Sequence, residues 1–137
     1  MELARMTVYD LVGGEQPFFD LATAFYRRID REPAIRDMFP THLAGPIDRL
    51  ALFLIQYFGG PGTYSEKRGH PRLRMRHIPF RVDRAARDIW VGHMLAAIDE
   101  VEIAEPARSA MREYFERGAT FMINVEDEEA APAQGTS

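Results

Sequence analysis

The chain has 137 residues and a mass of 15.7 kDa, which is enough for one compact domain but not comfortably for two. Its 46% hydrophobic and 28% charged residues are those of an ordinary globular domain, which excludes a disordered or fibrous chain. Because the chain has no cysteine, disulfide bonds, thiolate metal sites and thioether-linked cofactors are excluded as well.

Neither a membrane span nor a secretory signal is expected. The longest apolar stretch, residues 50–58, is nine residues long and contains Gln56, whereas a helix that crosses a bilayer needs roughly 20 residues. The first ten residues carry acids and arginine before any apolar run, unlike a secretory signal. We therefore predict a cytoplasmic protein that does not enter the membrane.

The net charge of −4 comes from one short segment near the end of the chain. Residues 126–129 are four acids, and the other 17 acids (21 − 4) balance the 17 lysines and arginines. We predict that residues 126–137 are a disordered acidic tail and that residues 1–125 fold as one domain. A second imbalance lies in residues 67–87, where eight bases accompany the single acid Asp83. This basic segment needs an anion, unless it is a solvated surface or a nucleic-acid patch.

Helical periodicity dominates the chain, and no segment alternates convincingly at period two, which predicts an all-α fold. Apolar residues recur every three or four positions in four stretches: 18–29, 47–58, 86–101 and 107–122. Proline and glycine bound them, at Pro33, Pro46, residues 59–61 and Pro106, and Asp83 is the expected N-cap of the third stretch. We also expect a helical turn over residues 34–39, a loop over 62–69, and a fifth helix over 71–79.

The expected buried face of the third stretch includes two polar-tipped side chains, Trp90 and His93. Its members are Ala86, Ile89, Trp90, His93, Ala97, Ile98 and Val101.

Three residues are the candidates for chemistry. His77 lies in the last turn of the fifth helix, and a neutral imidazole is a common ligand of iron, zinc and copper, although a single helical histidine is more often a partly exposed side chain. Tyr26 and Trp90 each put a hydrogen-bond donor on an apolar helical face. By spacing alone, each donor is expected to reach a backbone carbonyl. His42, His70 and His93 form no metal-binding pair, so a metal cage built from protein side chains alone is not expected.

Residues 59–80, GGPGTYSEKRGHPRLRMRHIPF, closely resemble the signature of the group II (group O) truncated haemoglobins, which are bacterial globins. The resemblance extends from Thr7 to about Asn124. It implies a two-over-two helical sandwich around a noncovalent haem b (iron protoporphyrin IX), with His77 as the proximal iron ligand. The haem-wall positions that it implies are Phe39, Pro46, Leu50, Phe53, Leu73, Phe80, Trp90 and Met94.

The same resemblance assigns roles to polar residues. The haem propionates are the anions of the basic segment, and their expected partners are Arg49, Tyr64, Arg68 and Arg76. Arginine suits a carboxylate because its guanidinium donates in a fork. On the distal side, the residues that match the ligand-contacting donors are Tyr26 and Trp90. Phe39 stands where many relatives carry tyrosine, and Pro46 cannot donate a hydrogen bond, so these two donors form the whole expected network.

The resemblance implies a protein that binds O2 tightly, and NO and CO as well, at a pentacoordinate haem iron. Oxygen binding or transport, oxidation of NO by the oxygen-loaded form, and peroxide-driven oxidation are the activities associated with such proteins. The alternative is a haem-based gas or redox sensor or interaction module without turnover. An electron-donating reductase and a second copy of the chain are open as partners, and neither nucleic acid nor membrane is expected.

Overall fold

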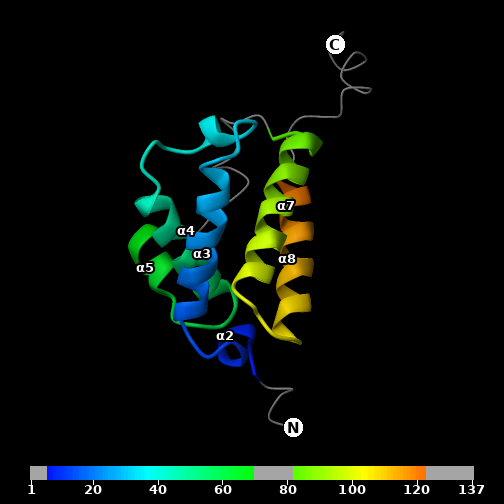
Figure 1. Ribbon diagram of the computed structural model, residues 1–137. Coiled ribbons are helices and arrows are strands. Elements are labelled where there is room, and N and C mark those ends of the chain that lie inside the picture. Colours follow the sequence, from blue (N-terminus) through cyan, green and yellow to red (C-terminus); the bar gives the residue numbers. More distant parts are fainter. Residues whose placement is uncertain (1–5, 70–81, 123–137) are drawn as a thin grey trace, which may run out of the picture.

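Two pairs of long helices pack against each other in the computed structural model (Figure 1). The structure describes residues 6–69 and 82–122, which contain helices and no strand. Helix α3 packs against both α4 and α7, and α7 packs against α8, so the spatial order is α4, α3, α7, α8. The elements are α2 (Val8–Leu11), α3 (Gln16–Ile29), the 3-10 helix η1 (Arg36–Met38), α4 (Ala44–Tyr57), α5 (Thr63–Arg68), α7 (Arg84–Glu100) and α8 (Ala107–Phe121).

Helix α3 is the central element, and its buried face has the predicted spacing. Phe18, Leu21, Phe25 and Ile29 are each at most 1% exposed. The helix ends at Ile29, four residues before the proline that was expected to stop it, and the Asp30 N–H closes the last turn on the Tyr26 carbonyl at 2.9 Å. The predicted helical turn over 34–39 is present as the 3-10 helix η1.

Helix α4 begins two residues before Pro46, which is buried in its first turn, where the amide that proline lacks has no helical partner. The predicted end at the Gly59–Gly60 pair is confirmed. Gly59 has φ +107°, and a Cβ there would stand 2.4 Å from the Thr7 Cβ, so the glycine lets α2 pack against the end of α4.

The prediction of a loop over residues 62–69 is wrong, because Thr63–Arg68 form helix α5. The segment is polar and has no apolar period, so contacts with α4 stabilise its helix. The Gln56 Nε2 donates to Ser65 Oγ at 2.7 Å, and the Ser65 N–H donates to Gln56 Oε1 at 2.9 Å. The Tyr64 ring, 4% exposed, meets the Phe53 ring edge-on at 5.6 Å between centroids.

The N-cap predicted for α7 is confirmed, since Asp83 Oδ1 accepts a hydrogen bond from the Ala86 N–H at 2.8 Å. The predicted buried face needs a correction. His93 is not a core residue: its side chain is 25% exposed, and its Nε2 lies 2.7 Å from Glu32 Oε1. The positions that the prediction omitted, Val91 and Met94, are buried instead.

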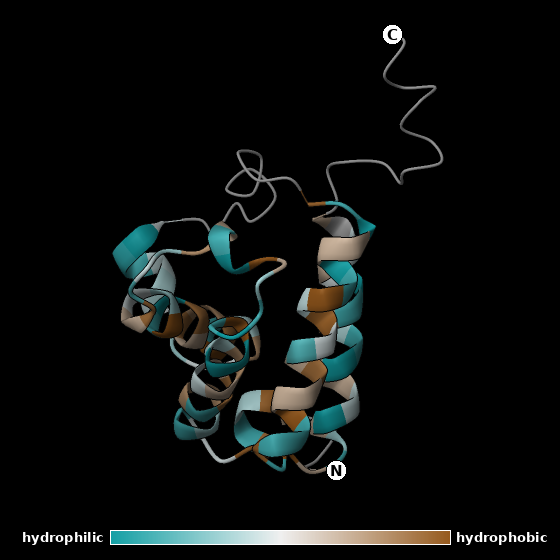
Figure 2. Ribbon diagram, turned by 45° about the horizontal axis from the view of Figure 1, so that its top comes forward, coloured by the Kyte–Doolittle hydropathy of each residue, from teal (hydrophilic) through white to brown (hydrophobic). Residues whose placement is uncertain are grey.

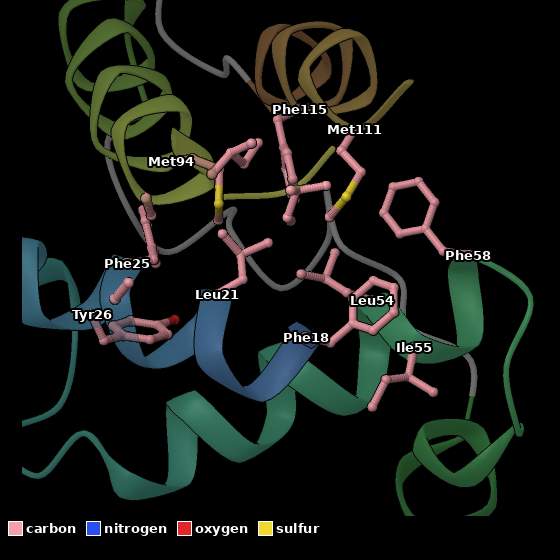
Figure 3. Close-up of a cluster of buried hydrophobic side chains, with 14 of the residues drawn as sticks. Phe18, Leu21, Phe25, Tyr26, Leu54, Ile55, Phe58, Met94, Met111 and Phe115 are labelled. Atoms are coloured by element: carbon pink, nitrogen blue, oxygen red, sulfur yellow. The ribbon is translucent and has the colours of Figure 1, made fainter. Parts of the chain in front are cut away.

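The core lies where α3, α4, α7 and α8 meet (Figure 3). Each long helix carries both hydrophobic and hydrophilic residues, as expected of helices with one buried face (Figure 2). None of the helices in the described ranges has the length and apolar character needed to cross a membrane. The predicted helix over 71–79 and the predicted tail over 126–137 lie outside the described residues.

Candidate functional site

An aromatic row joins α3 to α7 and brings the two predicted donors to the same region. The Phe25 ring lies 5.0 Å from the Tyr26 ring and 4.9 Å from the Trp90 ring, measured between centroids. On its other side Tyr26 meets the Phe39 ring edge-on at 5.6 Å. Figure 3 shows the Tyr26 ring on the α4 side of α3. Residues 64 positions apart in the sequence therefore flank a single phenylalanine.

Both donors lack a partner in the part of the chain that the structure describes. Neither the Tyr26 hydroxyl nor the Trp90 indole N–H donates to another described residue, although Tyr26 is only 8% exposed. The expectation that each reaches a backbone carbonyl is therefore not met within residues 6–69 and 82–122. Burial raises the pKa of Tyr26 to about 12, against an opposing effect of the Arg49 charge, so its hydroxyl keeps its proton near neutral pH.

Helix α4 is apolar on two faces, and only one of them is fully packed. Ala51 and Leu54 are wholly buried, on the face that belongs to the core. Leu50 and Phe53, on the adjoining face with the buried Pro46, are only partly covered. Such a face fits the flat apolar surface of a porphyrin. Met94 differs from these wall candidates because it is 0% exposed and lies in the core cluster.

Three of the four predicted propionate partners lie on neighbouring helices. Arg49 on α4 is partly buried, and its guanidinium folds back over the first turn, where a Cβ at Gly45 would stand 3.0 Å from Nη1. Tyr64 and Arg68 lie one turn apart on α5, which the Gln56–Ser65 hydrogen bonds attach to α4. These cationic and phenolic groups are the chemistry that carboxylates require.

Arg87, which belongs to the basic segment, binds α8 instead of an external anion. Its Nε donates to Thr120 Oγ1 at 3.0 Å and its Nη2 donates to the Glu116 carbonyl at 2.9 Å, so it ties α7 to α8. It also forms an ion pair with Asp88 at 3.0 Å. Arg87 is therefore a structural tether, and the anion-binding interpretation does not apply to it.

The remaining predicted site residues, His77, Leu73, Arg76 and Phe80, lie outside the described residues, and so does His70. His42 is exposed, as expected of a loop residue. Within the described ranges, no three histidines or acids gather in a way that could hold a metal ion. The described residues thus fit a prosthetic group that brings its own metal ligands: an apolar face, two unpaired donors and nearby cations.

Sequence reasoning missed one polar group beside this site, Arg36. Its guanidinium donates to three successive backbone carbonyls, those of Phe39, Pro40 and Thr41, at 2.9–3.2 Å. No pattern in the sequence could have revealed these bonds, because the acceptors are main-chain atoms that every residue carries.

A model of the bacterial-like globin family matches residues 7–124, so the chain belongs to that family. The chain is 34% identical over 116 residues to Group 2 truncated hemoglobin YjbI of Bacillus subtilis (strain 168), an alignment that covers 85% of this chain and 88% of that protein.

Solved structures agree with this assignment. The hemoglobin of the thermophilic phototrophic bacterium Chloroflexus aurantiacus is 50% identical, with a TM-score of 0.85 over 87% of this chain and 98% of that one. The truncated oxygen-avid haemoglobin of Bacillus subtilis is 34% identical, with a TM-score of 0.82 over 86% and 99% of the two chains. Within its family the chain is a group II truncated haemoglobin with the two-over-two fold, as its sequence predicted. This membership implies a haem and ligand binding at its iron.

Proposed function

We propose that the protein binds O2 tightly at a noncovalent haem b, whose iron His77 would hold, with Tyr26 and Trp90 as donors to the bound gas. The observation that carries the proposal is the pair of unpaired donors, one on α3 and one on α7, on either side of Phe25. The Tyr26 side chain is 8% exposed and Trp90 is half-buried, and neither donates to another residue in 6–69 or 82–122, which favours a bound ligand as their partner.

The walls and edge of the proposed haem site follow from α4 and α5. Leu50 and Phe53 would contact the porphyrin from α4, because their face of this helix is apolar and partly covered. Arg49, Tyr64 and Arg68 would hold the propionates, since α5 is fixed to α4 by Gln56. We assign Leu73, Arg76, Phe80 and Met94 to the same site from the family resemblance.

The haem iron would supply the position at which O2, NO or CO binds and the redox chemistry of the bound ligand. The protein's part is to donate hydrogen bonds where the ligand gathers negative charge. The high pKa of Tyr26 keeps its proton available, and the Phe39 ring packs edge-on against the phenol. Each charge-assisted hydrogen bond contributes about 1.5–3 kcal/mol, so two bonds slow ligand release by a hundredfold or more, at about tenfold per 1.4 kcal/mol.

A protein that holds O2 in this way suits reaction of the bound gas better than its delivery. We therefore extend the proposal to oxidation of NO and to peroxide-driven oxidation, in the cytoplasm, with electrons from a reductase. A second copy of the chain is the proposed assembly partner. Its relative in Bacillus subtilis, described as oxygen-avid, supports the tight binding of O2.

The test is the O2 dissociation rate of the haem-loaded protein and of three variants: Tyr26→Phe, Trp90→Phe and the double variant. We expect each single variant to release O2 about tenfold faster, and the double variant about a hundredfold faster. The control is Tyr9→Phe, since Tyr9 stacks on Phe18 at 6.2 Å, away from the aromatic row. If the double variant releases O2 at the rate of the unmodified protein, the donor roles are wrong.

A further inference from the structure

Arg36 makes four hydrogen bonds in one short segment of chain. Its Nε donates to Asp30 Oδ1 at 3.1 Å, and its Nη1 donates to the Phe39 carbonyl at 3.2 Å and to the Pro40 carbonyl at 2.9 Å. Its Nη2 donates to the Thr41 carbonyl at 2.9 Å. Only a planar guanidinium offers enough donors in a fixed fork to bind all of these oxygens together.

The Arg36 side chain takes the place of backbone N–H groups as the hydrogen-bond partner of this segment. Residues 39–43 belong to no helix, and they connect η1 to α4 at one end of the molecule (Figure 1). No backbone N–H of the described residues donates to the three carbonyls that Arg36 binds. Without the guanidinium, the three carbonyls would have no hydrogen-bond partner among the described residues, and only the packing of Phe39 and Leu43 against the core would restrain this stretch.

Phe39, which belongs to the segment bound by Arg36, packs against Tyr26. The Phe39 backbone is extended, with φ −123° and ψ 155°, and its ring meets the Tyr26 ring at 5.6 Å and 80°. An edge-on contact of this kind depends on ring orientation. A shift of the backbone at residue 39 would therefore move the ring against which the Tyr26 side chain packs.

We infer that Arg36 is a positioning residue of the ligand site. By binding the carbonyls of residues 39–41, Arg36 holds Phe39 against Tyr26, and this contact fixes the position of the Tyr26 hydroxyl. The inference rests on the proposed function in assigning Tyr26 to the ligand. The ion pair with Asp30 is a separate matter, because the Asp30 side chain is 60% exposed and such pairs add little to stability.

The first test uses the haem-free protein and asks only about geometry. Tyrosine is labelled with 13C in the ring, and the Tyr26 signal is identified by its absence from Tyr26→Phe. Arg36→Lys keeps the positive charge but has a single nitrogen in place of the three guanidinium nitrogens that make the four bonds, so we expect the Tyr26 signal to shift and broaden. The matched control is Arg27→Lys, which replaces the neighbour of Tyr26 that pairs with Glu100 at 2.9 Å. An unchanged Tyr26 signal in Arg36→Lys overturns the inference.

The second test measures O2 dissociation from the haem-loaded protein in two backgrounds. Arg36→Lys is expected to release O2 about threefold to tenfold faster, as for partial loss of one hydrogen bond, and Arg27→Lys to leave the rate unchanged. In the Tyr26→Phe background, Arg36→Lys should have no further effect. Equal acceleration in both backgrounds overturns the inference, because Arg36 then does not act through the hydroxyl.

The two proposals can fail separately. If Tyr26→Phe alone leaves O2 release unchanged, the proposed donor role fails, and the inferred effect of Arg36 on the ligand is overturned with it. If Tyr26→Phe accelerates release but Arg36→Lys does not, only the inference is overturned. Helical circular dichroism monitors folding. Should Arg36→Lys not fold, Arg36→Gln takes its place with the same expected results, since it too lacks the fork.

Discussion

Two apolar regions of the molecule differ in how far the protein's own side chains complete them. In the core between α3, α7 and α8, Leu21, Ile98 and Met111 are 0% exposed. On the face of α4 that carries Leu50 and Phe53, Leu50 is only partly covered, and the Tyr26 hydroxyl, on the α4 side of α3, has no partner among the described residues. The first region is packed as protein interiors are, whereas the second has the features of a surface that a ligand completes.

The core half of this comparison is tested most strongly by Phe18→Ala. Phe18 is 1% exposed and contacts the Tyr9 and Phe58 rings at about 6 Å. Its removal should lower the free energy of unfolding by about 3–5 kcal/mol, through lost burial and the cavity left behind. Urea unfolding measures this loss, which should be the same with and without haem. A loss that appears only in the haem-loaded protein would contradict a core complete in itself.

The face of α4 that carries Leu50 and Phe53 is tested by Leu50→Ala. Because Leu50 is only partly covered, the haem-free protein should lose about 1 kcal/mol or less, whereas the haem-loaded protein should lose about 2–3 kcal/mol. Urea unfolding of both forms gives the two values. The matched control is Leu54→Ala on the buried face of α4, which should lose the same amount in both forms. Equal losses for Leu50→Ala would remove this face from the haem site.

Alkaline titration tests whether Tyr26 is a buried, protonated donor. Its folded-state pKa is raised by burial from 10.0 to about 12, so the folded state holds the proton more tightly than the unfolded state. The contribution of the protonated Tyr26 to the free energy of unfolding is fully present below pH 10 and is lost as the pH rises toward 12. Between pH 9 and pH 11 the haem-free protein should lose about 1 kcal/mol that Tyr26→Phe does not lose. Tyr9→Phe, whose ring stacks on Phe18 away from the aromatic row, is the control, and an equal loss in Tyr26→Phe would contradict burial of the hydroxyl.

The smallest expected effect concerns the contact between α7 and the segment after α3. Two hydrogen bonds hold the pKa of the Glu32 carboxyl below its ordinary value of 4.5: the larger effect comes from His93 and the smaller from the Ala34 N–H. Its contribution to stability is therefore present above pH 4.5 and is lost as the pH falls below that value. Glu32→Gln should be slightly less stable than the unmodified protein at pH 7, and the difference should shrink at pH 3. The exposed Glu113→Gln should show neither change.

The sequence predicts the long helices well, because their apolar spacing and their end residues are local signals. Gly59 and Asp83 mark helix ends in the structure as they do in the sequence. Helix α5 could not be predicted in this way, since it depends on Gln56, which lies nine positions before Ser65. His93 was misplaced for a related reason: its partner Glu32 is 61 positions away.

The residues of the candidate site also differ in whether the sequence indicates them. Helical spacing marks Tyr26 and Trp90 as donors on apolar faces, and the family resemblance assigns them to the ligand. The structure brings their helices together around Phe25. Arg36 gave no signal, because the oxygens that it binds belong to the backbone. Long-range polar partners of this kind follow from the packed fold and not from the spacing of residues along the chain.

The central claim is that the α4 face and the two donors surround a haem whose iron is held by His77. Its most direct test is the visible spectrum of the haem-titrated protein in the ferric, ferrous and CO-bound forms, for the unmodified chain, for His77→Ala, and for His93→Ala as the matched control. The account predicts a Soret band at one haem per chain that shifts with CO in the unmodified chain and in His93→Ala, and that is weakened or displaced in His77→Ala. A failure to take up haem stoichiometrically, or identical spectra for His77→Ala and the unmodified chain, would contradict it.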